Sequence, residues 1–540
     1  MADPRPPTDP ARLQVTRHAL DGVAEQMGVA LQRSAYSPNI TGRLDLSAAI
    51  FSPSGEMVAQ AEHIPVHLGS MPASVDSILG AFDLSPGMTA VVNDPYRGGS
   101  HLPDITLVGA VGDREDGRSG QLIGYVANRA HHADIAGAAP GSMPADATDI
   151  AMEGLRIPPL LLVDDHGERT DVIEMLAANS RTPTERHGDL RAQFAANHAG
   201  AARLCEMAAE RGRDGLLADM DALVDYAERR IRAALAEMPD GEWTFSDWLE
   251  VAADGSMDAA AQAVGLELHT TVAIRGDQLV VDLTRCPPQV PANVNAVRAV
   301  TESAALFVLR LVTDPDAPAN AGTARAMTVQ TTPGTIVDAV FPAPVATGNV
   351  ETSQRLVDLL LGALAQAVPD RVPAASQGTM NNILIGSSGQ GTPFAYYETI
   401  GGGEGGTPGR PGMDGVHTGM TNTRNTPVEA LEVAYPLRVV RSELRSGTGG
   451  EGLHAGGDGI VREIEVLTDA RVTVQTERRA RGPWGLGGGR AGQPGRNTLI
   501  RPDGTTQALP AKVTLTVQAG DRIRLETPGG GGWGTQAAHQ

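Results

Sequence analysis

Apolar residues recur at helical spacing near the start of the chain. Between residues 11 and 34 most of them fall three or four positions apart, which places them on one face of an α-helix. A helical pattern rich in Ala, Glu, Arg and Leu returns over 184–238, and apolar helices are predicted over 298–313 and 351–368. The first helix is expected to pack against a core, and the charged helix over 184–238 to present a solvated face.

Short apolar runs divided by Gly, Pro, Asn and Asp occupy the region from Asp45 to about Pro159. Such runs predict strands joined by loops. From about residue 460 apolar and polar residues alternate between turn glycines, which is typical of a strand-rich domain. The individual strands are predicted over 47–51, 90–93, 105–111, 121–127 and 266–284.

A glycine-dense tract extends from Gly386 to Gly459. Its glycines are interleaved with Tyr, Asn and Glu, whereas a flexible linker would be more monotonous, so ordered loops are predicted. The whole pattern indicates an α+β, strand-rich, multi-domain fold. Its expected parts are 1–180 (a helix and a strand-and-loop region that carries the candidate metal site), 181–380 (helical and mixed), 381–460 (glycine-rich ordered loops) and 461–540 (a β-rich C-terminal domain).

Composition narrows the class of protein. The chain has 540 residues, of which 41% are hydrophobic and 20% charged, as in a globular enzyme. Its formal net charge of −21 argues against nucleic acid as a partner, because phosphate backbones are bound by Lys and Arg. No stretch approaches ~18 uninterrupted apolar residues, and no apolar signal segment follows the first residues. We therefore expect a cytoplasmic protein with no membrane contact.

Lys512 is the single lysine in the sequence. A P-loop nucleotide site is excluded, because its motif requires a lysine and is absent. A Schiff-base mechanism is disfavoured too, since Lys512 lies in a predicted strand. The two cysteines, Cys205 and Cys286, have neither the number nor the spacing of a disulfide framework or a zinc knuckle. Any metal would therefore be bound by His and carboxylate.

Five of the 13 histidines fall between residues 63 and 132. His101 and Asp104 end a stretch that runs from Asn93 through two glycines, which favour a tight turn. His131 and His132 follow a predicted strand. Each pair alone is more typical of a hydrogen-bonded turn, but together they predict a His/Asp site for zinc, manganese or ferrous iron. Such a site suits hydrolysis or attack on an activated carbonyl.

Other histidines and carboxylates are weaker candidates. His63 and His67 could line a substrate pocket, and Pro65 between them favours an extended or turn conformation. They could equally be ordinary loop histidines. His417 and the pair Glu429 and Glu432 carry less chemical signal. A serine-hydrolase site is disfavoured, because no complete Gly-x-Ser-x-Gly motif occurs.

Ten short stretches, spread along the chain, together resemble the motifs of one known family. They are Asp45–Phe51, Val58–Gln60, His63–Pro72, Asn93–Asp104, Ala127–Asp134, Gly348–Gln354, Gln377–Asn382, Tyr435–Arg438, Gly456–Arg462 and Pro483–Leu486. Over essentially the whole chain the set resembles hydantoinase B, the B subunit of ATP-dependent N-methylhydantoinase/5-oxoprolinase. Subunits of acetone and acetophenone carboxylases are relatives of this family.

The resemblance implies a division of labour in a hetero-oligomer. An A-type subunit, an actin-like ATPase, would use ATP to phosphorylate the carbonyl oxygen of a small cyclic amide. This chain would then open the ring at a divalent metal, which makes it a hydrolase of cyclic-amide C–N bonds. The family motifs place the metal ligands at Asp45, His101, Asp104 and His131, and they favour His131 over His132.

His67 or His63 would move a proton during ring opening. The rival within the family is ATP-dependent ketone carboxylation at the same metal, and a rival outside catalysis is a scaffold for the ATPase subunit. The sequence departs from the family pattern at Leu46, Gly42 and Ala136. These departures bear on how the substrate is placed more than on the metal.

Overall fold

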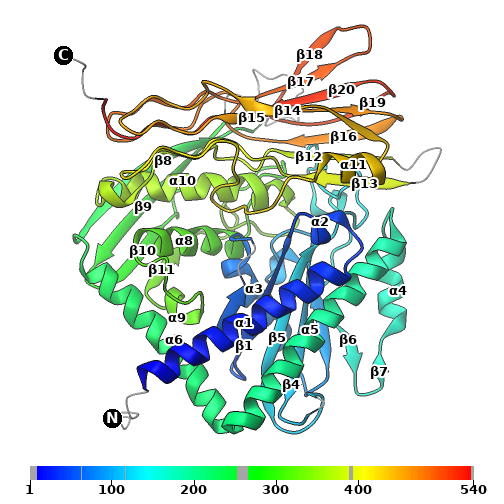
Figure 1. Cartoon of the computed structure of the whole chain (residues 1–540), viewed down its shortest axis with the longest axis vertical. Coiled ribbons are helices and arrows are strands. Elements are labelled where there is room, and N and C mark those ends of the chain that lie inside the picture. Colours follow the sequence, from blue (N-terminus) through cyan, green and yellow to red (C-terminus); the bar gives the residue numbers. More distant parts are fainter. Residues whose placement is uncertain (1–8, 62–63, 116, 252–264, 388–392, 537–540) are drawn as a thin grey trace.

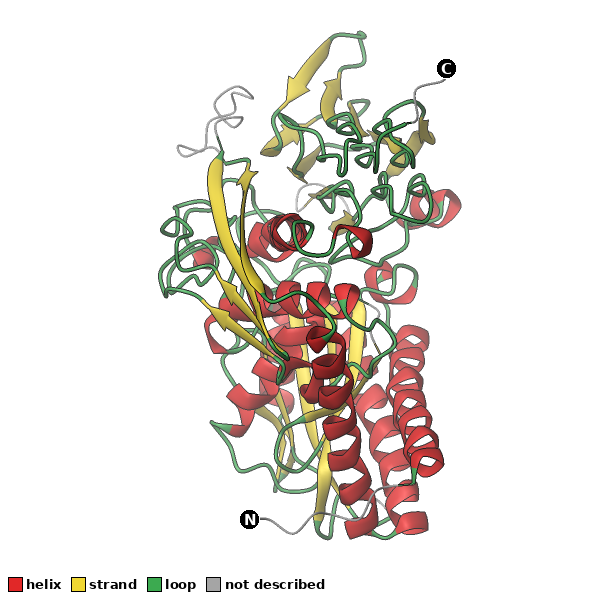
Figure 2. Cartoon of the chain, turned by 90° about the vertical axis from the view of Figure 1, so that its left-hand side faces the viewer, coloured by secondary structure: helices red, strands yellow, loops and turns green. Residues whose placement is uncertain are grey.

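The computed structural model describes residues 9–61, 64–115, 117–251, 265–387 and 393–536. Within these residues the strands form four sheets, and helices pack on the first two (Figures 1 and 2). The predicted α+β class, with several sheets and no barrel, is confirmed. No helix in these ranges is both long and apolar enough to cross a bilayer.

The four predicted helical segments are present with two differences, and the helices over 67–79 and 170–178 were not predicted. The segment predicted over 184–238 is split in two, because Gly212 has a φ of 74° that ends the first helix. The segment predicted over 351–368 begins with a π-helical turn, η3 (Gly348–Thr352). The helices are α1 (Pro10–Ser34), α2 (Pro38–Thr41), α3 (His67–Leu79), α4 (Thr170–Ala178), α5 (Pro183–Arg211), α6 (Arg213–Ala236), α8 (Arg298–Val312), α9 (Ala321–Ala324), α10 (Ser353–Leu364) and α11 (Val428–Ala434).

The first sheet is antiparallel throughout, in the order β2-β1-β5-β4-β3-β6-β7. Its strands are β1 (Leu46–Phe51), β2 (Met57–Ala61), β3 (Thr89–Val92), β4 (Asp104–Gly112), β5 (Leu122–His131), β6 (Leu160–Asp164) and β7 (Gly167–Glu168). Ala48 and Ile50 share a core with α1 and α5, whereas Ala49 and Phe51 share one with α3. Both faces are therefore buried, and apolar residues run through β1 without polar alternation.

The second sheet, in the order β11-β10-β9-β8, supports the middle of the chain. Its strands are β8 (Gly241–Leu249), β9 (Leu266–Arg275), β10 (Gln278–Asp282) and β11 (Met327–Gln330). Helix α10 packs on β8, β9 and α8. Helix α8 packs in turn on α3, a helix that packs on the first sheet. This chain of contacts brings the π-helical turn η3 close to the first sheet.

The third and fourth sheets form a sandwich toward the C-terminus (Figure 1). Their orders are β13-β12-β16-β19 and β14-β15-β20-β17-β18. Val472 of one sheet and Ile464 of the other lie in a common core, which explains the alternating pattern after residue 460. The strands are β12 (Asn382–Ser387), β13 (Phe394–Glu398), β14 (Leu437–Arg445), β15 (Gly459–Val466), β16 (Ala470–Gln475), β17 (Arg496–Ile500), β18 (Thr506–Leu509), β19 (Lys512–Val517) and β20 (Arg522–Glu526).

The described part of the glycine-dense tract is ordered, as predicted, but it also contains β13, α11 and β14 in addition to loops. Its backbone binds the C-terminal glycines directly. The amide of Gly450 donates to the carbonyl of Gly530 at 2.8 Å, and the amide of Gly530 donates to the carbonyl of Gly457 at 2.9 Å. A Cβ atom on Gly457 would lie 1.9 Å from the carbonyl oxygen of Met413. Segments this close exclude side chains, which accounts for the glycine content.

Candidate metal centre

The ends of three neighbouring strands bring the candidate ligands together. Asp104 begins β4 and His131 ends β5, and the antiparallel register pairs these two residues directly. Asp45 lies just before β1 on the other side of β5, and its carbonyl oxygen accepts a hydrogen bond from the His131 amide at 3.1 Å. Residues that are distant in sequence therefore meet at one edge of the first sheet.

His101 reaches the same place from the turn before β4. This turn follows a short 3-10 helix, η1 (Pro95–Arg97), and contains Gly98, whose φ is 85°. A Cβ atom on Gly98 would lie 2.1 Å from the carbonyl oxygen of Ala73, so the position requires glycine. The tight turn predicted from the sequence is confirmed.

Asp104 lies at the centre of the cluster. Its Oδ2 atom is 3.1 Å from His101 Nδ1, and its Oδ1 atom is 3.4 Å from His131 Nδ1. One ligand atom from each of these three residues lies within 4.8 Å of the others, and all three side chains are buried. Asp45 stands at the edge, with Oδ2 4.0 Å from His131 Nδ1. His101, Asp104 and His131 could together hold a single divalent ion.

Several atoms of the cluster make no well-aligned hydrogen bond in the described part of the protein. Both ring nitrogens of His101, Nε2 of His131 and Oδ1 of Asp104 are buried without a hydrogen bond. An unpaired buried polar atom costs free energy, yet imidazole nitrogen and carboxylate oxygen are ordinary ligands of borderline divalent metals. The residues present therefore fit a divalent cation.

The ionisation of the cluster also suits a metal. Burial lowers the pKa of His101, which favours its neutral imidazole. Burial by itself would raise the pKa of Asp104, but His101 and His67 hold that pKa well below its usual range. Neutral imidazole and ionised carboxylate are the forms that bind metal ions.

His67 lies at the start of a helix and joins the cluster. Pro65 and Val66 form a turn, as predicted for the segment around Pro65, and helix α3 begins directly after it at His67. Pro65 precedes the helix, where its missing N–H removes no helical hydrogen bond. Its Nδ1 lies 2.9 Å from Ser47 Oγ, and its Nε2 lies 3.3 Å from Asp104 Oδ2. The other predicted histidine, His63, lies outside the described residues.

The adjacent histidines at the end of β5 have different surroundings. His131 faces the cluster, whereas His132 Nε2 lies 3.0 Å from Gln193 Oε1 on α5. Successive side chains of an extended segment point to opposite sides, so only one of the two can face the cavity. Burial and Arg186 lower the pKa of His132 to about 3, which keeps it neutral. Asp134 is also turned away and pairs with Arg181 at 2.8 Å.

Residues from the second half of the chain close a small cavity over the cluster. The cavity has room for about one water molecule or ion. Its remaining wall was not predicted from the sequence, although the stretches Gly348–Gln354 and Gln377–Asn382 contain part of it. The missed lining residues are Asn349, Val350, Met380, Tyr397, Thr399, Thr421 and Thr423.

The weaker candidates do not line this cavity. His417 lines a separate one, and Glu432 accepts a hydrogen bond from the amide of Val439 at 2.9 Å. Glu429 lies beside it on α11. Lys512 is buried at the start of β19, with Nζ 2.6 Å from Glu477 Oε1, so its role is structural.

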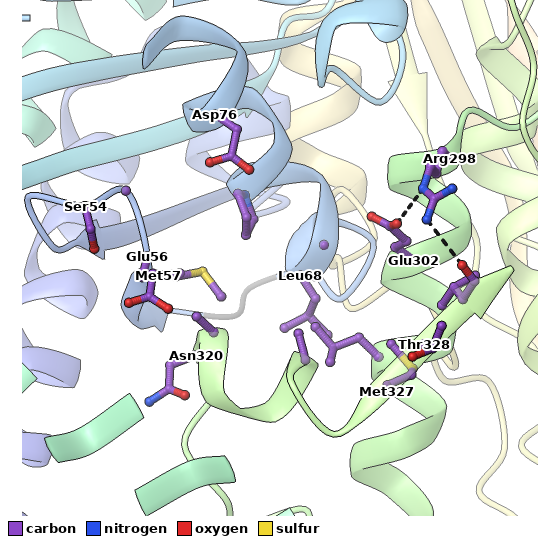
Figure 3. A pocket seen from close by; sticks show the side chains of 17 residues that line it. Ser54, Glu56, Met57, Leu68, Asp76, Arg298, Glu302, Asn320, Met327 and Thr328 are labelled. Carbon is purple, nitrogen blue, oxygen red and sulfur yellow. Dashed lines mark hydrogen bonds and ion pairs between the residues drawn. The ribbon is translucent and has the colours of Figure 1, made fainter. Parts of the chain in front are cut away.

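A larger cavity of about 490 Å³ lies between α3 and α8 (Figure 3). Leu68 and Asp76 of α3 line one side of it, and Arg298 and Glu302 of α8 pair at 2.7 Å on the other. None of the predicted metal ligands is among its lining residues. The smaller cavity at the strand ends therefore carries the candidate site.

Comparison with known proteins places this geometry in context. The sequence profile described as hydantoinase B/oxoprolinase matches residues 9–536. An uncharacterized protein of Methanocaldococcus jannaschii is 39% identical, over 98% of this chain and 91% of the relative. The putative B subunit of a D-/L-hydantoinase from Pseudomonas sp. is 33% identical, over 97% and 90%. 5-Oxoprolinase 1 of Arabidopsis thaliana is 37% identical over 98% of this chain, which spans only 42% of that enzyme.

Solved structures share the fold over nearly the whole chain. The ATP-dependent caprolactamase from Pseudomonas jessenii superposes with a TM-score of 0.88 at 29% identity, covering 98% of this chain and 92% of that one. Nucleotide-free acetone carboxylase superposes with a TM-score of 0.86 at 18% identity, covering 98% and 76%. The second similarity is one of fold alone.

Proposed function

The chain belongs to the hydantoinase B/oxoprolinase family, and on that premise we propose that it is the B subunit of an ATP-dependent cyclic-amide hydrolase. Relatives named 5-oxoprolinase, hydantoinase and caprolactamase support a cyclic amide as substrate. The chain spans less than half of the 5-oxoprolinases it matches, and its sequence has no P-loop. ATP would be used by an A-type ATPase subunit in a cytoplasmic hetero-oligomer.

The observation that carries this proposal is the buried cluster, several of whose ligand atoms make no well-aligned hydrogen bond. His101, Asp104 and His131 would hold zinc, manganese or iron, with Asp45 completing the set from the edge. Such an ion, when bound, polarises a carbonyl oxygen and makes water acidic enough to act as a nucleophile near neutral pH.

The chain's own residues would orient the Asp104 carboxylate and transfer protons during the reaction. His67 lies between Ser47 and Asp104, so it orients the Asp104 carboxylate and can accept a proton there. His63 is the second candidate for proton transfer. Water adds to the phosphorylated carbonyl carbon and the ring C–N bond breaks, with the protons of that water passing to the nitrogen, which leaves an acyl phosphate. A second water hydrolyses the acyl phosphate to a carboxylate and free phosphate. The product is an N-carbamoyl amino acid or a glutamate-like open chain, according to the ring.

Reconstitution with the ATPase subunit tests the proposal. Hydantoin, 5-oxoproline and caprolactam would be supplied with ATP, and ring opening and metal content would be measured for wild type and His101→Ala. We expect ATP-dependent opening of at least one ring by the wild type, and loss of both metal and activity in the variant. Full activity of His101→Ala would overturn the assignment of the site.

The same experiment separates the rival functions. A requirement for bicarbonate with a ketone substrate would identify a carboxylase subunit. A complex that uses ATP normally although this chain binds no metal would identify a scaffold. Either result would replace the hydrolase assignment.

A further inference from the structure

The larger cavity between α3 and α8 has the size and the lining of a small-molecule site. Its volume of about 490 Å³ falls within the usual range of ligand pockets. Met57, Leu68, Leu306 and Val329 line it, and each of these apolar side chains is at most 8% exposed. These four residues form an apolar floor, which suits the apolar body of a ligand.

The charged side chains around this floor are unequally paired. Among the described residues, three carboxylates line the cavity, those of Glu56, Asp76 and Glu302, but only one guanidinium, that of Arg298. Arg298 pairs with Glu302 at 2.7 Å, and Glu56 pairs with Arg325, which lies outside the lining. Asp76 has no cationic partner in the described part of the chain. The cavity therefore keeps one negative charge that a ligand can neutralise.

Asp76 lies where a ligand on the apolar floor would reach it. Leu68, Pro72 and Asp76 are spaced by four residues on α3, so they follow one face of the helix, the face that lines the cavity. In Figure 3 Asp76 lies on one side and the pair of Arg298 and Glu302 on the other, with Leu68 between them. Partial loss of solvent raises the pKa of Asp76. A ligand cation beside this carboxylate would favour its ionised form.

We propose that this cavity binds a small primary amine with an apolar body. The ammonium group donates to the Asp76 carboxylate, and the apolar body lies on the floor against Met57 and Leu68. Breaking the C–N bond of a lactam frees the ring nitrogen as a primary amine, so the open-chain product belongs to this ligand class. That link to the product rests on the proposed function. The product would then bind against α3, the helix that begins with His67 of the metal cluster.

Calorimetric titration of the full chain with hexylamine, without ATP or a partner subunit, tests the site. We expect saturable binding of hexylamine, and binding at least about 10-fold weaker for hexanol, which has the same chain without the charge. Asp76→Asn should weaken hexylamine binding by about 10-fold, because an ionic hydrogen bond is lost. Asp83→Asn is the matched control, since Asp83 is exposed and lies outside the lining, and it should bind like the wild type.

A second variant tests whether the ligand lies inside the cavity. Thr328 is an exposed residue of β11 that lines it, so Thr328→Trp can fill the space without disturbing the core, and it should abolish hexylamine binding. Gln330→Trp, on the same strand and outside the lining, should bind like the wild type. Absence of binding to the wild type would overturn the proposal. Undiminished binding by Asp76→Asn or by Thr328→Trp would overturn it as well.

A further titration identifies the source of the amine. 6-Aminohexanoate, the open-chain form of caprolactam, carries the same ammonium group together with a carboxylate. Its binding to the wild type, weakened in Asp76→Asn, would support the product as ligand, whereas binding of hexylamine alone would refute the link to the product. These titrations require no ring opening. A reconstituted complex that opens no ring would therefore refute the proposed function and not this site.

Discussion

The imidazole ring of His131 stacks on the phenol ring of Tyr397, with the ring centroids 4.5 Å apart and the planes inclined by 14°. Arg43 covers Tyr397 with its guanidinium carbon 4.5 Å from the ring centroid, and it donates to the Tyr397 carbonyl at 2.7 Å. A residue of β13 thereby orients a candidate ligand at the end of β5. The site at the edge of the first sheet depends on the second half of the chain.

This stacking predicts a difference between two substitutions at Tyr397. Tyr397→Phe keeps the ring and loses the hydroxyl that donates to Asn382 Oδ1 at 2.9 Å, so we expect unchanged metal affinity and a stability loss of about 1 kcal/mol. Tyr397→Leu frees the imidazole and should weaken metal binding by about 10-fold. Metal titration and thermal unfolding of both variants provide the measurements. Equal metal affinity in the two would show that stacking does not orient His131.

His131, the last residue of β5, and His132, directly after it, provide an internally controlled test of the metal site. His131→Ala removes a candidate ligand and should lower metal affinity by at least about 100-fold. His132→Ala removes a side chain that contacts Gln193, so it should lower thermal stability while the protein still binds metal. Metal content after dialysis distinguishes the two variants. Loss of metal from His132→Ala alone would reverse the assignment.

The glycine network predicts a steep and position-specific stability cost. In Gly457→Ala the new methyl group would lie 1.9 Å from the Met413 carbonyl oxygen, which forces the backbone apart and should cost about 2 kcal/mol or more. Gly409→Ala is the control, since nothing lies within 4 Å of a Cβ atom there. Denaturant unfolding of the two variants measures the difference. Similar stabilities would contradict the close packing of this tract.

The sequence predicted the parts of the fold that follow from local spacing. The helix over 11–34 was predictable because the periodicity of its apolar residues reflects which face is buried, and β1, β3, β4 and β5 were predictable as short apolar runs between turn residues. The turn around Gly98 was predictable because glycine is needed there. The break at Gly212 and the helix start at His67 were not, since a single glycine or proline is compatible with several local conformations.

The candidate site could be predicted only in part, because several of its residues come from segments that are distant in the sequence. His101 and Asp104 stand three residues apart, so their proximity is visible in the sequence. Asn349, Tyr397 and Thr421 reach the cavity through packing between sheets, which leaves no local pattern. A family motif marked Asn349, but it gave no sign that this residue lines the cavity.

Glu153 offers a test of burial away from the metal centre. Its carboxylate is fully buried and accepts hydrogen bonds from the backbone amides of Val345 and Ala346, each at 3.0 Å. Burial raises its pKa to about 8, against the lowering effect of the two amides. This carboxylate fixes the segment that leads into η3, so its protonation is linked to the stability of that region.

The raised pKa predicts that stability falls as the pH rises. Between about 4.5 and about 8 the folded protein keeps a proton on Glu153 that the unfolded chain has released, so the free energy of unfolding decreases across this interval. Glu153→Gln cannot release the proton and should show a shallower decrease, whereas Gln in place of the exposed Glu210 should leave the wild-type slope unchanged. Thermal unfolding at several pH values from about 5 to about 8 measures these slopes. A group contributes to the pH dependence of stability only when its affinity for protons differs between the folded and unfolded states. Equal slopes for wild type and Glu153→Gln would therefore mean that Glu153 ionises in the folded protein as easily as in the unfolded chain.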